Sequence, residues 1–341
     1  MLLDQLLSMI PSDTEERVRR TRDRFNQNIR EAIRQETGLR FRPRSRAGDL
    51  QPAEFIGVPV RLVAGLPKSL KKREVDDRWR IAALLAPWRR TLEQLRNSST
   101  VTAERVVPIV RDLFLMDAEA QLRSTAGLAE DLLQRMQGFD LAKWILDINE
   151  DVLGLYCCDL SGNTRPDKLE SHIELYWGVI GLFGQILGVS PEALTIVVLA
   201  HELGHAYTHR AADIDGRTWD SVAFGNSDRP LIEGLAQYYA ARTCERLIIS
   251  APEAGEAYKE LLKHQPESYK KHVRWLEKHR PEEVRFALVV ARREGEMKLE
   301  RFETQLKAAR WQLRGDEAAK AEAAEAKEPE AEEPEAKEPE A

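Results

Sequence analysis

The spacing of apolar residues along the chain predicts a protein built mainly of helices. Residues 12–38 carry a narrow apolar stripe at helical spacing, with a Ser12 and Glu15 capping box before it and Gly38 after it. From residue 76 to about 146 the pattern stays helical, and after residue 249 it continues in charged helices. Breaks in these later helices are expected near Pro252, Pro266 and Pro281.

Two short runs depart from the helical pattern and predict a small β-sheet. Residues 152–157 and 172–177 have strand composition. In the second run apolar and polar side chains alternate, which is typical of a strand with one buried face. The fold class expected from the whole pattern is α+β, predominantly α-helical, with a small sheet that precedes a long apolar helix.

That helix is predicted to begin at Pro191, because Ser190 can cap free amides and proline is already fixed at a helical φ. Its apolar stripe runs through Leu194 and Val198. Three histidines then continue the stripe at the same spacing, so we expect them to face inward. They are His201, His205 and His209.

The first two of these histidines belong to an H-E-x-x-H pentapeptide, His201 to His205. Residues four apart lie one turn above each other, about 6 Å along the axis, so both imidazoles can bind one metal ion. Glu202 is turned about 100° round the helix, where a carboxylate can hydrogen-bond a metal-bound water and act as general base. The alternative interpretation is a buried pair of helix histidines without a metal.

In this pentapeptide the chain resembles the zincin metallopeptidases, which carry it on a helix. The resemblance implies hydrolysis of a peptide or protein substrate with one Zn²⁺ per chain, and a third protein ligand. His209 lies about 12 Å along the helix from His201, too far to share the ion with both. The metzincin subclass would need Gly and His where this chain has Thr208 and Ala211.

The third ligand is expected on a second helix that starts at Asp228, Arg229 and Pro230. Glu233 on this helix resembles the glutamate ligand of the gluzincins; alternatively, it only favours the helix dipole. The interval from the motif is longer than in the best-known gluzincins. In addition, Gln237 stands where many have an acidic partner. Three loop acids therefore stay rivals, as ligand or as partner of a metal-bound imidazole: Asp213, Asp215 and Asp220.

Further site residues are candidates only. Tyr238 or Tyr239, or a C-terminal histidine, could stabilise an oxyanion; the histidines concerned are His264, His272 and His279, and we expect all three on a solvated surface. The zincin resemblance also implies an edge strand that binds an extended peptide. The candidate for this strand consists of His172, Ile173, Glu174, Leu175 and Tyr176, and the alternative is an ordinary core strand.

Composition adds a second functional hypothesis. The formal net charge is −6 over 341 residues, yet residues 17–46 are rich in arginine and an acidic Glu, Pro, Ala and Lys tail follows Gly315. The alternative function is a catalytically silent zincin-fold binding or regulatory protein whose arginine-rich arm contacts a protein partner or, less favoured, nucleic acid. Three cysteines without motif spacing, and no signal peptide or membrane segment, favour the cytoplasm and no membrane partner.

Five segments are expected along the chain. They are a basic helical arm and linker (1–52), a helical region (53–146), a zincin-like core (147–250), a charged helical region (251–315) and a disordered acidic tail (316–341).

Overall fold

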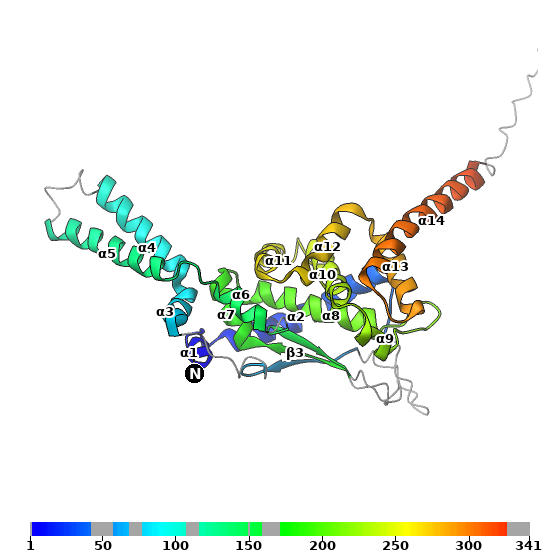
Figure 1. The fold of residues 1–341 in the computed structure, drawn as a ribbon, viewed down its shortest axis with the longest axis horizontal. Helices are drawn as coiled ribbons and strands as arrows, with labels where there is room; N and C mark the ends of the chain where they lie inside the picture. The colour runs from blue at the N-terminus through cyan, green and yellow to red at the C-terminus, as the bar shows by residue number, and fades with distance from the viewer. Residues whose placement is uncertain are drawn as a thin grey trace, which may run out of the picture.

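Most of the chain forms a predominantly helical fold with one three-stranded sheet, seen in a computed structural model (Figure 1). The structure describes residues 2–41, 57–67, 77–106, 116–148, 151–158 and 171–325. Within these ranges no helix is long and apolar enough to cross a membrane. Residues 42–52 of the linker expected over residues 40–52, and residues 326–341 of the expected tail, lie outside the described residues.

The α-helices of the described residues occupy most of the segments in which the apolar pattern predicted them. They are α1 (Leu2–Ser8), α2 (Thr14–Thr37), α3 (Asp77–Leu85), α4 (Arg89–Val101), α5 (Met116–Arg135), α6 (Leu141–Ile148), α7 (Trp177–Leu187), α8 (Pro191–Arg210), α9 (Ser221–Asn226), α10 (Arg229–Arg246), α11 (Glu253–His264), α12 (Glu267–Lys278), α13 (Pro281–Glu294) and α14 (Leu299–Glu325). A short 3₁₀ turn, η2 (Ala86–Trp88), precedes α4, and a π-helical segment, η3 (Thr102–Val106), follows it.

Helix α8 lies at the centre of the body and is buried along nearly its whole length. It begins at Pro191, and the Ser190 hydroxyl accepts a hydrogen bond from the Ala193 amide at 3.1 Å, so the predicted start is confirmed. Helices α2, α7, α10 and α11 pack on it, and the sheet covers a further side (Figure 1). The side chains of α8, including its histidines, are therefore enclosed by the surrounding helices and the sheet.

The sheet corrects the assignment of the edge strand. Its order is β1 (Val60–Val63), β3 (His172–Tyr176), β2 (Gly154–Cys157), with β1 parallel and β2 antiparallel to β3. The strand expected at the edge, β3, is thus hydrogen-bonded on both sides. The alternation in its sequence showed that one face is buried, but it carries no information on how many neighbours a strand has.

The basic helix α2 belongs to the body and is not a separate arm. Its stripe of Val18, Phe25, Ile29 and Ile33 is buried in the main core, and the helix packs along α8. Buried Glu36 near its end accepts hydrogen bonds from two arginines of α10. The predicted apolar stripe is confirmed, but its burial joins α2 to helices α8 and α10.

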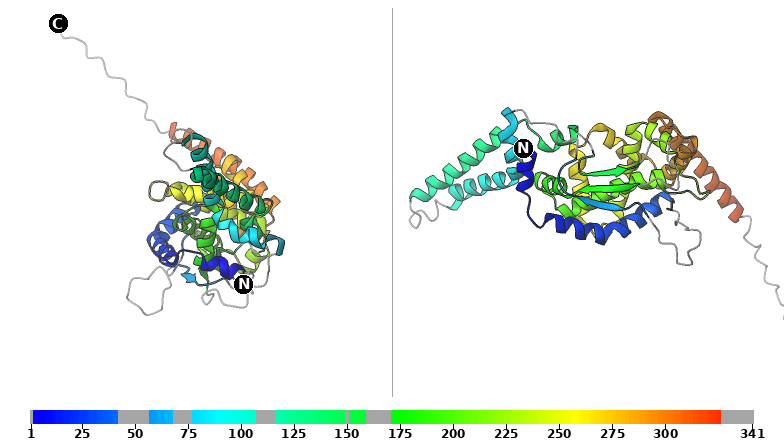
Figure 2. Two further views of the ribbon diagram at one scale, coloured as in Figure 1. Left: turned by 90° about the vertical axis from the view of Figure 1, so that its left-hand side faces the viewer. Right: turned by 90° about the horizontal axis from the view of Figure 1, so that it is seen from below.

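The molecule is elongated, because two helical parts project from opposite ends of the body. Helices α4 and α5 pack against each other as a hairpin at one end, and α14 extends from the other (Figures 1 and 2). Helix α14 runs to Glu325. Residues 316–325, which their composition assigns to a disordered tail, are therefore helical.

Candidate metal centre

Three buried side chains from two helices bring their donor atoms together. The Nε2 atoms of His201 and His205 on α8 lie 3.1 Å apart, and Glu233 Oε2 on α10 lies 3.4 and 3.3 Å from them. Two donors on a tetrahedral zinc, each about 2.1 Å from the ion, are about 3.4 Å apart. The triangle therefore has the dimensions of one face of a tetrahedral metal site.

The state of these groups also fits a cation. Glu233 Oε2 is buried and has no hydrogen-bond partner. Burial lowers the pKa of His205, but the carboxylates of Glu233, Glu202 and Asp151 together outweigh burial and raise that pKa to about 9. Positive charge next to the buried Glu233 carboxylate is therefore stabilised. A metal ion bound by two neutral imidazoles would supply that charge. The group can hold a metal ion, and its donors suit zinc among others.

Two helix features make the triangle possible. Glu233 lies in the second turn of α10, beyond the first turn where a glutamate would mainly favour the helix dipole. A β-carbon added at Gly204 of α8 would lie 3.0 Å from the Cα of Ala236 on α10. The absence of a side chain at Gly204 therefore lets the two helices approach closely enough for His205 and Glu233 to meet.

Glu202 lies beside the triangle and outside the donor set. Its carboxylate packs on Gly154 of β2, where an added β-carbon would stand 2.8 Å from Oε1. Burial raises the pKa of Glu202 to about 8, with the nearby Asp151 and Glu233 carboxylates adding to the effect, while His205 and a hydrogen bond from the Tyr156 amide oppose it. A carboxyl group in this state can exchange a proton near neutral pH.

A further layer of side chains surrounds His201 and Glu233. The ring of Tyr269 stacks on His201 with centroids 5.5 Å apart, and its hydroxyl donates to Asp151 Oδ1 at 3.0 Å. Arg229 lies 3.6 Å from Glu233 Oε1 and 3.7 Å from Asp151 Oδ2. These contacts hold the imidazole ring of His201 and the carboxylate of Glu233 in place.

A small cavity adjoins this layer. Its volume is about 20 Å³, and its lining includes His201, Glu202, Gln237 and Gln265. That is room for one water molecule. Gln237 donates to Gln265 Oε1 at 3.0 Å, while its own Oε1 is buried without a partner. Gln237 therefore lines the cavity next to the candidate centre.

The rival ligands lie elsewhere. Asp213 accepts from the Arg217 amide at 2.8 Å, Asp215 pairs with Arg293 of α13, and Asp220 caps α9 by accepting from the Ala223 amide. None of the three joins the buried group of donor atoms. The loop acids are engaged in local structure and not in the candidate centre.

His209 and the tyrosine pair are likewise engaged elsewhere. His209 lies between the Tyr156 and Ser221 hydroxyls, each at 3.0 Å, outside the donor group as expected from its height on α8. Tyr238 and Tyr239 are buried against each other. Neither lines the cavity beside Glu202.

Sequence reasoning missed several residues of the centre. Asp151, Tyr269 and Gln265 carry no local signal, because only the fold brings them to α8. Gly154 did carry one, since a glycine inside a strand often marks a close approach of another group. The expectation that the C-terminal histidines lie on a solvated surface is wrong for His272, which is fully buried, and the side chain of His279 is only 11% exposed.

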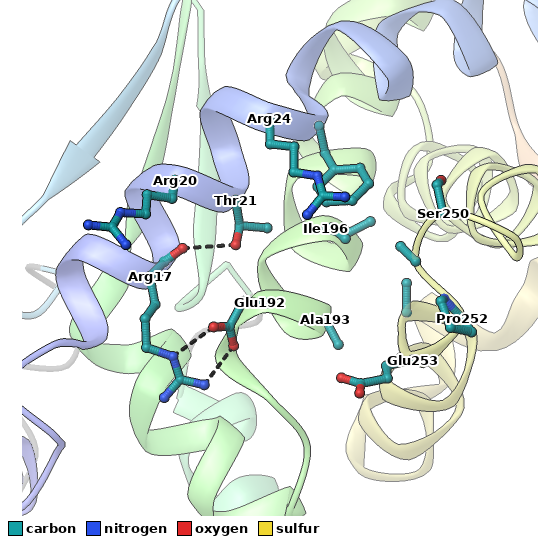
Figure 3. A pocket seen from close by; sticks show the side chains of 13 residues that line it. Arg17, Arg20, Thr21, Arg24, Glu192, Ala193, Ile196, Ser250, Pro252 and Glu253 are labelled. Atoms are coloured by element: carbon teal, nitrogen blue, oxygen red, sulfur yellow. Dashed lines mark hydrogen bonds and ion pairs between the residues drawn. The ribbon is translucent and has the colours of Figure 1, made fainter.

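A larger cavity of about 400 Å³ lies between α2, the start of α8 and the start of α11 (Figure 3). Arg17 on its wall forms two 2.7 Å hydrogen bonds with Glu192. Arg20, which also lines the cavity, pairs with Glu16, and farther along α2 Arg34 pairs with Glu31. Much of the charge of this arginine-rich helix is therefore compensated within the protein.

Comparison of the chain with models of protein families, with curated proteins and with solved structures found no match. The case for the centre rests on its own geometry.

Proposed function

We propose that the chain is a zinc-dependent metallopeptidase in which His201, His205 and Glu233 bind the metal and Glu202 is the general base. The observation that carries the proposal is the triangle of donor atoms, 3.1 to 3.4 Å apart, with a buried carboxylate on the same helix beside it. Binding by two imidazoles and one carboxylate leaves a fourth position open, as in catalytic zinc sites. The resemblance of the pentapeptide to the zincins supports the same reaction.

Zinc in this position would lower the pKa of a water molecule and polarise a peptide carbonyl. Glu202 accepts the proton of the attacking water and returns it to the leaving amine. Its raised pKa suits both steps, because the group must be a base first and an acid afterwards. The adjacent cavity offers room for the water. Tyr269 and Arg229 hold His201 and Glu233 in place.

The corrected sheet order moves the proposed peptide-binding edge to β2. Among the described strands β2 is paired on one side only, with β3. It also carries Gly154, which touches Glu202. An extended peptide bound along the outer edge of β2 by main-chain hydrogen bonds would therefore run next to the general base.

The test is a comparison of Glu202→Gln with wild type, with zinc content and hydrolysis measured on the same samples. The probe is a pool of unfolded peptides whose new termini are read by mass spectrometry. Glu202→Gln should keep its zinc and lose about 10²- to 10⁴-fold in rate, whereas His205→Ala and Glu233→Ala should lose the zinc as well. Glu192→Gln, on the same helix but outside the centre, is the matched control.

Two results would overturn the proposal. If Glu202→Gln hydrolysed the pool at the wild-type rate, the assigned base would be wrong. If wild type bound zinc through His205 and Glu233 but cleaved nothing, the alternative would stand: a catalytically silent binding or regulatory protein on the same scaffold.

A further inference from the structure

A second cluster of potential metal ligands lies on the sheet. Cys157 of β2 and His172 of β3 are direct partners in the antiparallel register, and Glu174 follows on the same face of β3. One ligand atom from each of the three side chains lies within 4.8 Å of the others, and all three are partly exposed. A thiol, an imidazole and a carboxylate are thus gathered at one point.

This cluster is separate from the centre on α8 and α10. Ile173 and Leu175 of β3 are fully buried and face the core, so their neighbours His172 and Glu174 face the other way. Tyr156, on the core face of β2, reaches His209 of α8, and Cys157 next to it points to the opposite face. The sheet therefore lies between the two groups of ligands.

The geometry of the cluster suits a metal ion with tetrahedral coordination. His172 Nε2 and Glu174 Oε1 are 3.3 Å apart, close to the roughly 3.4 Å between two donors on one zinc ion. The Tyr176 hydroxyl donates to the other carboxylate oxygen of Glu174 at 2.7 Å. Such an outer hydrogen bond fixes the direction of a carboxylate ligand.

A metal that binds here would displace the proton of the Cys157 thiol to solvent and gain an anionic sulfur ligand.

We propose that Cys157, His172 and Glu174 form a second zinc site, with water as the fourth ligand. Thiolate and imidazole ligands select zinc over magnesium or calcium. Bound metal would tie β2 to β3. Since β2 carries Gly154 and the Tyr156 amide, both in contact with Glu202, the site would hold the strand that positions the general base of the proposed peptidase. The metal site itself does not depend on that function.

Cobalt provides a readout specific to this site. A Co²⁺–thiolate bond gives an intense near-ultraviolet charge-transfer band, whereas the centre of His201, His205 and Glu233 contains no sulfur. Titration of the metal-free full-length chain with Co²⁺ should produce the band in wild type. It should be lost in Cys157→Ser and retained in the matched controls Cys158→Ser and Cys244→Ser.

Metal counting separates the two sites. Elemental analysis should give two zinc ions per chain in wild type and one in either Cys157→Ser or His205→Ala, with the cobalt band intact in His205→Ala. His172→Gln keeps the thiol but loses the imidazole. Its Co²⁺ affinity, measured from the charge-transfer band, should fall by at least about tenfold. The proposal is wrong if wild type gives no band, if the band survives in Cys157→Ser, or if it needs Cys158. The cobalt band and the metal counts do not depend on peptidase activity, so a protein that hydrolyses no peptide would still test the second site.

Discussion

The carboxylate of Glu202 lies against the backbone of β2, where Gly154 leaves room for it. An added β-carbon would meet Glu202 Oε1 at 2.8 Å and Val198 Cγ1 at 2.7 Å. Contacts this short cannot persist, so a larger residue at position 154 must displace the strand or the carboxylate. The placement of the proposed base thus depends on a residue with no side chain of its own.

We therefore expect Gly154→Ala to keep its zinc but lose activity. A displacement of a reacting group by about 1 Å costs on the order of a hundredfold in rate, which peptide hydrolysis would measure. Gly127→Ala, in α5 with nothing within 4 Å of the new methyl group, should behave as wild type. Unchanged hydrolysis by Gly154→Ala would show that Glu202 is not positioned by β2.

His272 is a buried neutral group that should make stability depend on pH. Its Nδ1–H donates to the Tyr269 carbonyl at 2.7 Å, and its Nε2 accepts from the Tyr258 hydroxyl. Burial lowers its pKa from 6.5 to about 4. Between these values the unfolded chain binds a proton that the folded chain does not, so stability falls as the pH falls through this window.

Urea unfolding should detect this contribution. Between about pH 7 and pH 5 wild type should lose about 2 kcal/mol more than His272→Gln does. The comparison of the two chains removes the effect of other groups that titrate in the same range. An identical pH dependence in both would mean that the pKa of His272 is the same in the folded and the unfolded chain.

At the residue scale the sequence predicted the relative positions of side chains that lie on the same helix. His201, Glu202 and His205 could be assigned because fixed spacing on a helix determines their relative positions. Glu233 needed the resemblance to a family, and three loop acids competed with it. Asp151 and Tyr269 could not be found, since their approach to His201 depends on how distant helices and loops pack.

At the scale of elements, the triangle of donor atoms from His201, His205 and Glu233 depends on how closely α8 and α10 cross. At Gly204 an added β-carbon would lie 3.0 Å from Cα and 3.1 Å from the carbonyl oxygen of Ala236. Both are backbone atoms, which cannot rotate away as a flexible side chain can. The helices would have to separate, and Glu233 would move away from the two histidines.

Gly204→Ala should accordingly weaken zinc binding by about tenfold or more and destabilise the fold by roughly 1–3 kcal/mol. A competition titration with a chelating dye would measure the first effect and denaturant unfolding the second. Gly255→Ala in α11 adds the same methyl group with nothing within 4 Å, so it should preserve affinity. Equal zinc affinity in both variants would contradict the close-approach argument.

Element boundaries were more predictable than element partners. Helices α8 and α10 begin at Pro191 and Arg229, within the predicted start sequences, because the residues that favour a helix start are neighbours in the chain. The central position of β3 was missed because its parallel partner β1 comes from residues 60–63, far upstream in the chain. The arginine-rich α2 was taken for an arm because its charge is visible in the sequence, whereas its packing on α8 is not.

At the scale of the whole molecule, the α4–α5 hairpin is only lightly tied to the body. It packs on itself and projects from one end (Figures 1 and 2). At its base Arg90 hydrogen-bonds the carbonyls of Leu187 and Gly188 at the end of α7. The candidate metal centre, in contrast, lies between α8 and α10 in the middle of the body. Metal binding should therefore stabilise the body and leave the hairpin unaffected.

Hydrogen–deuterium exchange of the full-length chain with and without zinc tests this division. A ligand that binds only the folded state lowers the population of open states in the unit that contains its site. Amides of α8 and α10 should exchange at least about tenfold more slowly with zinc, while those of α4 and α5 should not change. In His205→Ala the difference at α8 and α10 should largely disappear. If zinc slowed exchange in the hairpin and the body equally, the two would unfold as one unit, and the hairpin would be part of the same cooperative structure as the centre.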